Sequence, residues 1–464
     1  MKFSLPDLLG KRVHLIGIGG AGMSGLARIM ASHGISVSGS DSKDSSVLSG
    51  LRVIGVSIFV GHDSDQVLGA DFLVYSSAIT TDNPEMLKAM ELNIPVLSRA
   101  QALAILMSES RSVAVAGTHG KTTTTSMLTV ALQSCGEDPS FAIGGVLKSS
   151  GANAHKGTGE FFIAEADESD GSFVEYHPYG AIITNIEHDH VDHFATPELV
   201  HEAFADFAET ISDQGFVVYC EDDPGAASLG ATVTHCTAIS YGVSIDADLR
   251  LDEIELAASS SRARVLWKGR SLGNLEMHVP GHHNLLNAAA ALTAGLLLGL
   301  PTAQLLEGLS VFRGTGRRFE LKGQVHGIRV IDDYGHHPTE IEATLRTASR
   351  YASDGRVLVI FQPHRYSRTR AFAKEFSRTL DLADQCWVLE VYGSSEKPIP
   401  GVSGLTISAA MKRGKFEPNF LTAIEEVVAA AKPGDVILTL GAGDVSSLAP
   451  VIVEVLSKKY QQNS

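Results

Sequence analysis

Three times along this chain, a short run of β-branched and other apolar residues leads through a polar or glycine-rich loop into a helical pattern. The apolar runs lie at 13–18, 112–116 and 356–361, and the helical patterns that follow lie at 19–31, 120–133 and 369–382. Strands that alternate with helices favour parallel sheets whose faces are covered by helices. The order of elements therefore predicts an α/β protein.

The length of 464 residues exceeds what one hydrophobic core holds, and about 150 residues per domain predicts three domains. An extended segment at 93–99 leads into a new helical pattern, which suggests a domain boundary near residue 98. The segment 312–318 is rich in Gly and Arg and precedes a β-rich stretch, which suggests a second domain boundary near residue 312. We expect domains at 1–98, 99–312 and 313–464.

Composition excludes some classes of protein. The chain has 37 Lys and Arg against 53 Asp and Glu, a net charge of −16, and no basic block, so general nucleic-acid binding is not expected. Its four cysteines form no CxxC pair, which is typical of a reducing compartment. The apolar stretch 288–300 is too short to cross a bilayer, and the N-terminal residues lack the layout of a signal peptide. We expect a cytoplasmic protein with no membrane partner.

The segment 113–125 carries the most specific local pattern, an apolar strand followed by a loop and a helix. The loop and the first helical residues are Gly117, Thr118, His119, Gly120, Lys121, Thr122 and Thr123. Glycines let backbone N–H groups line a phosphate cradle, and the helix N-terminus adds positive potential. A lysine at this place reaches the terminal phosphates and the following hydroxyl binds Mg²⁺. Val115 stands where the general motif has its first glycine, so this is a shortened variant of a nucleotide-phosphate loop.

Two downstream apolar strands end in polar residues. The first, at 161–165, ends in Glu165, with Asp167, Glu168 and Asp170 close behind. Carboxylates at a strand end beside a phosphate loop are expected ligands of Mg²⁺. The sequence leaves open which of these four acids contacts a metal.

The second strand, at 181–186, leads into a run of histidines and acids. Residues 188–193 fit H-x-H-x-D-H, a metal-binding signature of zinc hydrolases, and imidazoles at this spacing can hold zinc. A zinc hydrolase would not need the phosphate loop, so we keep this class only as an alternative.

A second glycine-rich loop lies near the N-terminus. Gly17, Gly19 and Gly22 give G-x-G-x-x-G between a strand and a helix, and Ser40 and Asp41 end the next strand, where a ribose-binding acid is expected. The simplest interpretation is a dinucleotide site, so an NAD-dependent dehydrogenase is the rival from a different class. Two observations oppose it: a second nucleotide site begins at Gly117, and the same loop suits any nucleoside diphosphate.

Taken together, these segments resemble the Mur ligases of bacterial peptidoglycan synthesis. The resemblance runs nearly end to end through HLIGIGGAGMSG (14–25), SGSD (38–41), VYSSAI (74–79), GTHGKTTTT (117–125), EADESD (165–170), TNIEHDHVDHF (184–194), PGHHNLLNAAAA (280–291), GTGRRFE (314–320), DDYGHHPTE (332–340) and FQPHRYSRTR (361–370). It implies an N-terminal Rossmann-like domain for UDP, a central P-loop ATPase-like domain for ATP, and a C-terminal Rossmann-like domain that closes over ATP and receives the amino acid.

The resemblance also assigns roles to single residues. It implies that the UDP-sugar is bound by Gly17, Gly19, Gly20, Ala21, Gly22, Met23, Ser40, Asp41, Ser76 and Ser77. It implies that ATP is bound by residues 117–123 together with Asn284, Asn287, Arg318 and Asp333. Two Mg²⁺ ions are implied, with ligands Thr122, Glu165 and His190. The amino-acid end is implied to be Tyr334, His336, Arg365 and Arg368, and the catalytic group to be Lys121, Glu165, His190, His336 and Arg365.

Some of these residues have plainer explanations. Asn284 alone is explained by a helix N-cap, but that leaves Asn287, one turn later, unexplained. His336 and His337 also suit a packed turn before Pro338. Arginines suit an α-carboxylate because the guanidinium group binds it with two hydrogen bonds, and His336 is a candidate to position or deprotonate the amine.

The reaction implied by the resemblance is the ATP-dependent addition of L-alanine to the lactyl carboxylate of UDP-N-acetylmuramate, through an acyl phosphate, with release of ADP and phosphate. The alternative within the family is a recycling ligase that adds a whole tripeptide to the same sugar nucleotide. Serine or glycine as acceptor stays open, because one methyl group in a pocket discriminates by only about 10–200-fold. We expect a monomer or a weak homodimer.

Overall fold

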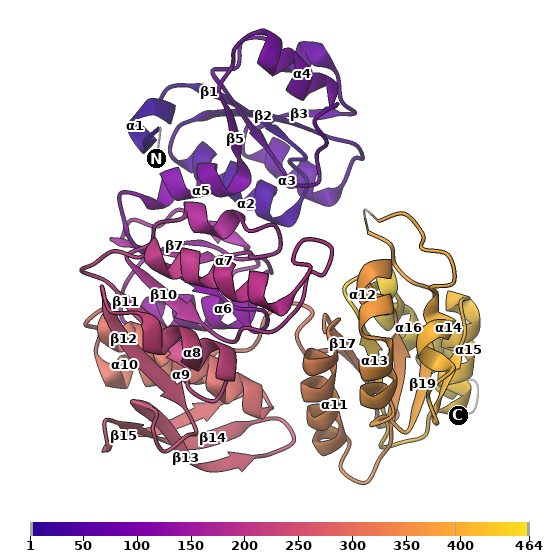
Figure 1. Ribbon diagram of the computed structural model, residues 1–464. Helices are drawn as coiled ribbons and strands as arrows, with labels where there is room; N and C mark the ends of the chain where they lie inside the picture. The colour runs from indigo at the N-terminus through magenta and orange to yellow at the C-terminus, as the bar shows by residue number, and fades with distance from the viewer. Residues whose placement is uncertain (1–2, 395, 462–464) are drawn as a thin grey trace.

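The computed structural model describes residues 3–394 and 396–461, and within these ranges the strands form three sheets (Figure 1). The N-terminal sheet, in indigo and purple, lies at the top of the view. The central sheet, in magenta and salmon, lies below it, and the C-terminal sheet, in orange and yellow, lies to the right. Helices cover the sheets in each domain, so the predicted three-domain α/β architecture is confirmed.

The N-terminal sheet has the strand order β3-β2-β1-β4-β5, and all its pairs are parallel. With the first strand in the middle, this is the order of a Rossmann-like domain. Its strands are β1 (Arg12–Ile16), β2 (Ser36–Asp41), β3 (Ser57–Val60), β4 (Phe72–Tyr75) and β5 (Val96–Ser98). Its helices are α1 (Leu5–Leu8), α2 (Ala21–Ser32), α3 (Ser46–Val53) and α4 (Pro84–Glu91), with the 3₁₀ turn η1 (Ser64–Val67). The carboxyl ends of β1, β2 and β4 therefore share one edge.

The central sheet is mixed, in the order β15-β14-β13-β12-β11-β10-β6-β9-β7-β8. Strands β6, β7, β9, β10, β11, β12 and β13 pair in parallel, whereas β8, β14 and β15 are antiparallel additions. Its strands are β6 (Arg111–Ala116), β7 (Ser140–Ala142), β8 (Ala154–His155), β9 (Phe161–Glu165), β10 (Gly180–Ile183), β11 (Phe216–Cys220), β12 (Thr237–Gly242), β13 (Leu249–Leu256), β14 (Ser261–Trp267) and β15 (Arg270–Met277). Its helices are α5 (Arg99–Met107), α6 (Lys121–Ser134), α7 (Pro197–Glu209), α8 (Pro224–Thr232), α9 (His282–Leu297) and α10 (Thr302–Val311), with η2 (Ser172–Glu175).

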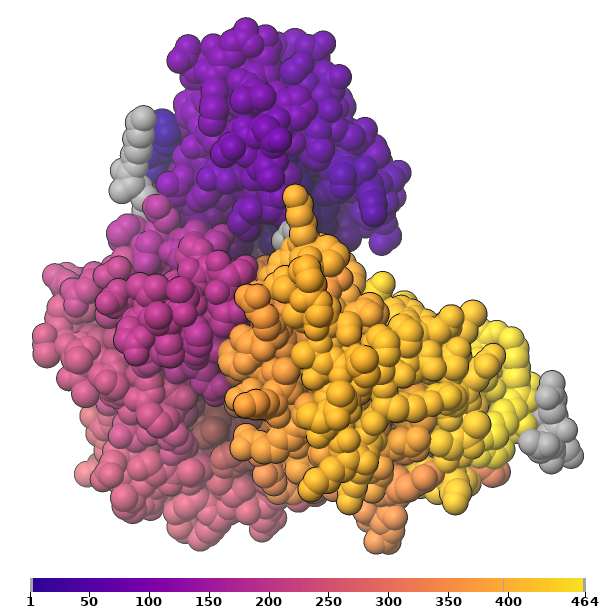
Figure 2. All heavy atoms as spheres, turned by 45° about the vertical axis from the view of Figure 1, so that its right-hand side comes forward, coloured from indigo at the N-terminus to yellow at the C-terminus, as the bar shows by residue number. Residues whose placement is uncertain are grey.

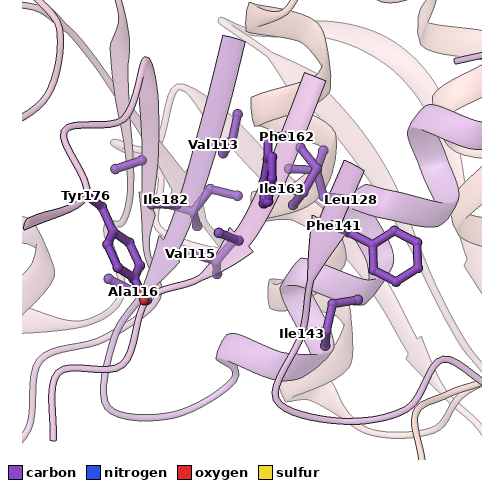
Figure 3. Close-up of a cluster of buried hydrophobic side chains, with 14 of the residues drawn as sticks. Val113, Val115, Ala116, Leu128, Phe141, Ile143, Phe162, Ile163, Tyr176 and Ile182 are labelled. Carbon is purple, nitrogen blue, oxygen red and sulfur yellow. The ribbon is translucent and has the colours of Figure 1, made fainter. Parts of the chain in front are cut away.

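The core beneath the phosphate loop is built from these central strands (Figure 3). Val113 and Val115 of β6, Ile163 of β9 and Ile182 of β10 are fully buried side by side, and Leu128 of α6 packs onto them. Parallel strands covered on both faces are expected to be continuously apolar, as these are. The consequence is a rigid sheet edge from which the loop after β6 emerges.

The C-terminal sheet has the order β16-β17-β21-β18-β19-β20, parallel except for the β16–β17 pair. Its strands are β16 (Glu320–Val325), β17 (Ile328–Asp333), β18 (Val357–Phe361), β19 (Gln385–Val388), β20 (Gly414–Phe416) and β21 (Val436–Leu440). Its helices are α11 (Pro338–Ala352), α12 (Tyr366–Ala371), α13 (Ala373–Leu380), α14 (Gly404–Ser408), α15 (Phe420–Ala430) and α16 (Leu448–Gln461), with η3 (Asp444–Ser447).

The hydrophobic clusters are distributed unevenly between the domains. One cluster runs from Leu15 of the N-terminal sheet into Val113 and Ile182 of the central sheet, whereas the C-terminal domain has two clusters of its own. The N-terminal and central domains thus share apolar packing. The C-terminal domain meets the central domain mainly through polar and charged side chains, described below.

One sequence prediction needs correction. The helical pattern at 369–382 is two helices, α12 and α13, which are separated at Phe372. Phe372 leaves the helical conformation, and its ring packs edge-on against the rings of His188 and His337. This tertiary contact overrides the local helical preference. Among the described residues, no helix combines the length and the apolar character that crossing a bilayer requires.

Candidate active site

The loop 117–120 leaves β6 and wraps tightly against the end of β10. Gly117 and Gly120 have φ values of 129° and 84°, in the region that favours glycine. A Cβ atom on Gly117 would lie 2.0 Å from the Thr184 hydroxyl oxygen, and one on Gly120 would lie 2.7 Å from the Asn287 amide oxygen. Asn185 fixes the loop, since its side-chain oxygen accepts a hydrogen bond from the His119 N–H at 2.8 Å. The glycines are thus required by both conformation and space.

Lys121 begins α6 and is held at the mouth of this loop. Its ammonium group donates to the Gly117 carbonyl at 2.6 Å, to the Thr118 carbonyl at 3.2 Å and to Glu168 at 2.8 Å. Burial opposes its charge, but Glu168 and Asp167 outweigh that effect, so the pKa of Lys121 is raised. The lysine is a fixed cation beside the loop.

The acids after β9 have separate partners. Glu165 accepts from the Thr122 hydroxyl at 2.9 Å and from the Gly144 N–H at 2.7 Å. Glu168 lies between Lys121 and His190, whose Nε2 atom is 3.4 Å away. These residues form one cluster, which brings the predicted metal ligands Thr122, Glu165 and His190 to the same edge of the central sheet.

Asp167 and Asp170 point elsewhere. Asp167 pairs with Arg99 at 3.4 Å; burial opposes its charge, but Arg99 and Lys121 lower its pKa to about 2. Asp170 accepts from the Ser172 N–H at the start of η2. Of the four acids, Glu165 and Glu168 are the two that contact Thr122, Lys121 or His190.

The residues of this cluster fit a divalent cation. The second carboxylate oxygen of Glu168 and the Nδ1 atom of His190 are buried and have no hydrogen-bond partner. Buried polar atoms without a partner are rare in native proteins. Carboxylate, hydroxyl and phosphate oxygens are the donors that Mg²⁺ prefers, with imidazole as an occasional addition.

A cavity of about 340 Å³ adjoins the phosphate loop and is lined by residues of the central and C-terminal domains. Its lining includes His119, Gly120, Thr123, Asn284, Asn287, Arg318 and Asp333, together with the apolar side chains of Phe312, Phe319, Leu321 and Tyr351. Most of the residues predicted to bind ATP thus line one cavity. Asn284 does not cap α9, because the N-cap is Gly281 and the Asn284 amide donates to the Pro280 carbonyl at 2.7 Å.

Arg318 and Asp333 are anchored inside the C-terminal domain. Arg318 donates to Glu340 at 3.1 Å. Asp333 accepts from the N–H groups of Phe319 at 2.7 Å and Gly335 at 2.9 Å. Their polar contacts shape the wall of the cavity and leave Asp333 largely buried.

A second cavity, of about 280 Å³, lies between the N-terminal and central domains. Its lining includes Gly20, Ala21, Gly22, Met23, Ser76, Ser77, Arg99, Asn153, Glu165 and Asp167. It reaches Glu165, which is bonded to Thr122 of the phosphate-loop helix. The two cavities share no lining residue: Thr123 of α6 lines the first, and Glu165, which is bonded to Thr122 of the same helix, lines the second.

Four residues predicted to contact the UDP-sugar do not line this cavity. Gly17 and Gly19 build the loop, and the Gly19 N–H donates to Asp41 at 2.9 Å. Ser40 is fully buried, and its hydroxyl donates to Glu85 at 2.8 Å. Glu85 also lies 2.6 Å from His14 and 2.6 Å from His62. In this structure Ser40 belongs to a buried polar network of the N-terminal domain.

The predicted amino-acid end is formed where the C-terminal domain meets the central domain (Figure 2). Arg368 is buried and forms a two-pronged ion pair with Asp189, with distances of 2.9 and 3.0 Å. Arg365 pairs with Asp192. Both arginines are thus engaged with acids of the central domain in this arrangement.

His336 lies near Arg368, and Tyr334 lies near Arg317 and Arg318. Burial, and then Arg368, hold the pKa of His336 well below its usual value, so its imidazole is neutral. Its Nδ1 atom lies 3.1 Å from the Tyr334 carbonyl, and the Tyr334 ring sits between the guanidinium groups of Arg317 and Arg318 at 4.9 and 5.1 Å. A neutral imidazole can accept a proton, as the predicted role requires.

The zinc-hydrolase alternative is wrong. His188 lies 3.0 Å from the Phe194 carbonyl, Asp192 pairs with Arg365, and His190 contacts Glu168, so the motif does not converge. His190 has a φ of 50°, which turns the chain between the two outer histidines.

Sequence reasoning missed several residues at the domain contact. Asp189 pairs with Arg368, Asn185 holds the phosphate loop, and Glu187 and Glu340 flank His119 at 3.6 and 3.5 Å. Asn185, Glu187 and Asp189 lie in the quoted segment 184–194, but the resemblance assigned no role to these three residues. The indication for Glu340 in the sequence was weaker, since it is an acidic residue one helical turn after His336.

Comparison with known proteins agrees with this geometry. Three family models match consecutive parts of the chain: the Mur ligase family catalytic domain at 12–111, the Mur ligase middle domain at 115–295, and the Mur ligase glutamate ligase domain at 317–443.

Relatives match over almost the full length. UDP-N-acetylmuramate–L-alanine ligase of Acidothermus cellulolyticus is 48% identical over 97% of this chain and 96% of its own. The ligase of the same name from Renibacterium salmoninarum is 49% identical over 100% of this chain and 99% of its own. The crystal structure of UDP-N-acetylmuramate-alanine ligase MurC from Thermotoga maritima aligns with a TM-score of 0.80 and 30% identity, over 98% of this chain and all of that one. A murein peptide ligase from Psychrobacter arcticus aligns with a TM-score of 0.73 and 25% identity, over 97% and 99%. The chain belongs to the Mur ligase family.

Proposed function

We propose that this protein is an ATP-dependent ligase that joins the lactyl carboxylate of UDP-N-acetylmuramate to the amino group of L-alanine in peptidoglycan precursor synthesis. The observation that carries the proposal is the full-length similarity to ligases of that name, at 48% and 49% identity. The geometry supports it, because Thr123 lines the cavity at the phosphate loop, Glu165 lines the cavity at the N-terminal glycine loop, and Thr122 of the same phosphate-loop helix is hydrogen-bonded to Glu165.

The chemistry explains why the two substrates must be bound close together. A carboxylate acylates an amine only after one of its oxygens has become part of a good leaving group. In the proposed first step, a carboxylate oxygen attacks the γ-phosphorus of ATP and the bond to ADP breaks, which gives an acyl phosphate. In the second step, the amine attacks the acyl carbon, loses a proton, and inorganic phosphate leaves with the bond electrons.

Counter-charge is the main requirement of the first step, because two anions must approach each other. Lys121 provides a fixed cation beside the phosphate loop, held there by Glu168 and two backbone carbonyls. We propose that Thr122, Glu165, Glu168 and His190 hold two Mg²⁺ ions. Bound Mg²⁺ would add positive charge at the phosphoryl oxygens.

We propose that the amino acid enters near Arg365 and His336. Arg365 is partly exposed and pairs with the partly exposed Asp192, so an incoming α-carboxylate can compete for its guanidinium group. Arg368 is buried with Asp189 and serves better to hold the domains together. His336, which is neutral and half-buried, is proposed to accept the proton of the attacking amine.

The test is phosphate release by the purified full chain with Mg·ATP and UDP-N-acetylmuramate, together with L-alanine, the tripeptide, or neither. The expected result is release that requires both UDP-N-acetylmuramate and L-alanine, with the amide product identified by mass spectrometry. Release with the tripeptide instead would move the assignment to a recycling ligase. Oxidation of NAD(P)H without phosphate release would overturn the ligase assignment altogether.

A further inference from the structure

A cluster of two histidines and one glutamate joins the central and C-terminal domains outside the predicted magnesium residues. His119 belongs to the loop after β6, Glu187 to the loop after β10, and His337 caps α11. His119 Nε2 lies 3.1 Å from His337 Nδ1 and 3.6 Å from a Glu187 oxygen, which is 3.8 Å from His337 Nδ1. Among the described residues, this is the one group of three His, Cys, Asp or Glu side chains whose donor atoms all lie within 4.8 Å of one another.

The spacing of the three donor atoms suits a small divalent cation. A triangle with these three sides has a centre about 2.0 Å from each corner, and Zn²⁺ binds imidazole nitrogen at about 2.0–2.1 Å and carboxylate oxygen at about 2.0–2.2 Å. Two imidazoles and one carboxylate favour Zn²⁺ or a similar transition metal, whereas Mg²⁺ prefers an all-oxygen set.

The groups around the cluster orient the donors. The other ring nitrogen of His119 lies 3.5 Å from Glu340, the carboxylate–histidine arrangement that often supports a metal-bound imidazole. The Thr339 hydroxyl donates to Glu187 at 2.7 Å. His337 Nδ1 has two hydrogen-bond contacts, with His119 Nε2 at 3.1 Å and with the Thr339 N–H at 3.4 Å, and a metal ion would replace them.

The charge of the cluster also favours a cation. Glu187 and Glu340 flank His119. Burial disfavours a charged imidazole there, but these carboxylates raise the pKa of His119 to about 9. Burial and His119 lower the pKa of His337 to about 4, so its lone pair is available at neutral pH. Because His119 Nε2 and His337 Nδ1 are in hydrogen-bond contact at 3.1 Å, a metal ion bound by both nitrogens would replace the proton between them.

We propose that His119, Glu187 and His337 form a site for Zn²⁺ or a similar transition-metal ion, which links the central domain to the C-terminal domain. His119 and Glu187 line the cavity of about 340 Å³, so the fourth coordination position opens toward the cavity and takes water or a phosphate oxygen. Because donors come from both domains, a bound ion holds them together and slows any step that requires them to separate. The proposal does not depend on the substrate of the ligase.

The experiment titrates the full chain with Co²⁺, in excess Mg²⁺ and without nucleotide, and follows visible absorption. We expect one Co²⁺ per chain with the intense bands of a four-coordinate site, displaced by Zn²⁺. His337→Gln is expected to weaken binding by at least about tenfold, and His337→Cys to restore it with a new sulfur-to-cobalt charge-transfer band. Circular dichroism checks that both variants are folded.

Two control variants locate the ion. His188→Gln changes a histidine of the H-x-H-x-D-H motif, and His190→Gln changes a proposed magnesium ligand. Both are expected to bind Co²⁺ as the unmodified protein does. Absence of four-coordinate bands, or binding that survives His337→Gln but is lost in His190→Gln or His188→Gln, would overturn the proposal.

Discussion

At the scale of single residues, the site depends on a few side chains whose charge is fixed by their neighbours. Lys121 is the clearest case, because two carbonyls and Glu168 hold its ammonium group in one position. A preorganised cation costs no reorganisation when negative charge gathers in the reaction.

Replacing Lys121 by methionine tests this role. We expect Lys121→Met to reduce the rate of ATP-dependent phosphate release by about 10²-fold or more, because the phosphates lose their fixed counter-charge. Lys268→Met, on the exposed turn between β14 and β15, is the matched control and should keep its rate. Equal rates in the two variants would remove Lys121 from the mechanism.

The two glycines that flank α6 allow the effect of backbone strain on stability to be separated from the effect of a steric clash with Asn287. Gly120, before α6, and Gly136, after it, both have a φ of 84°. A Cβ atom on Gly120 would lie 2.7 Å from Asn287, whereas one on Gly136 would meet nothing within 4 Å. We expect both alanine variants to lose about 1 kcal/mol of stability from the left-handed backbone, and only Gly120→Ala to weaken ATP binding as well. Calorimetric titration with ATP and thermal unfolding check this, and equal ATP affinity in both variants would contradict it.

At the scale of elements, the N-terminus of α11 organises the contact between domains. His337 caps the helix, and Glu340, in its first turn, accepts from the His336 N–H at 3.0 Å and pairs with Arg318. A carboxylate in the first turn of a helix is stabilised by the helix dipole. The histidines around this helix end are buried, so their protonation is tied to folding.

This coupling predicts a stability maximum near pH 6.5. Burial lowers the pKa of His283 and His337 to about 4 and that of His364 to about 3, from 6.5. Below pH 6.5 the unfolded chain binds protons that the folded chain does not, so each histidine costs up to about 1.4 kcal/mol per pH unit as the pH falls toward 4. His119 has a pKa of about 9, so its contribution is present below pH 6.5 and is lost as the pH rises through 9.

The measurement is the free energy of unfolding from pH 4 to pH 9. We expect His364→Gln to flatten the acid side of the curve, and His155→Gln, an exposed histidine, to leave it unchanged. A curve that rises steadily with pH, or an unchanged acid slope in His364→Gln, would contradict the assignment of neutral buried histidines.

At the scale of the whole molecule, the C-terminal domain is held to the central domain by polar contacts, whereas the other two domains share apolar packing. Charged contacts form and break more readily than a shared core, so closure of the C-terminal domain around the joint at 312–318 is the motion we expect. Its main fixed point is the buried pair Arg368–Asp189.

Asp189→Asn should loosen this closure. Removing one partner of a buried ion pair leaves an uncompensated charge and costs roughly 3–5 kcal/mol, here in the domain contact. We expect small-angle scattering to show a larger radius of gyration for the variant without ligands, and contraction with an ATP analogue and UDP-N-acetylmuramate. Asp192→Asn, which breaks the more exposed pair with Arg365, should change the dimensions little. Identical dimensions for both variants and the unmodified protein would count against a hinged closure.

The sequence by itself determined the features that depend on neighbouring residues. The strand, glycine loop and helix at 113–125 are local, so they appear as predicted in β6 and α6, and the α/β class follows from the repeated order of such units. The contiguous motifs also carried the resemblance to the family.

Only the tertiary structure decided which distant side chains contact each other and which are buried away from the cavities. Arg368 and Asp189 are separated by 179 positions, and His119 and His337 by 218, so no local pattern links them. Ser40 is predicted to bind the UDP-sugar, and the structure buries its hydroxyl against Glu85 of α4, 45 positions away along the chain. The outer histidines of 188–193 do not converge, because the chain turns at His190. Contacts of this kind arise when whole domains pack together. This packing fixes the directions of the side chains, whereas the spacing of residues along the chain does not determine them.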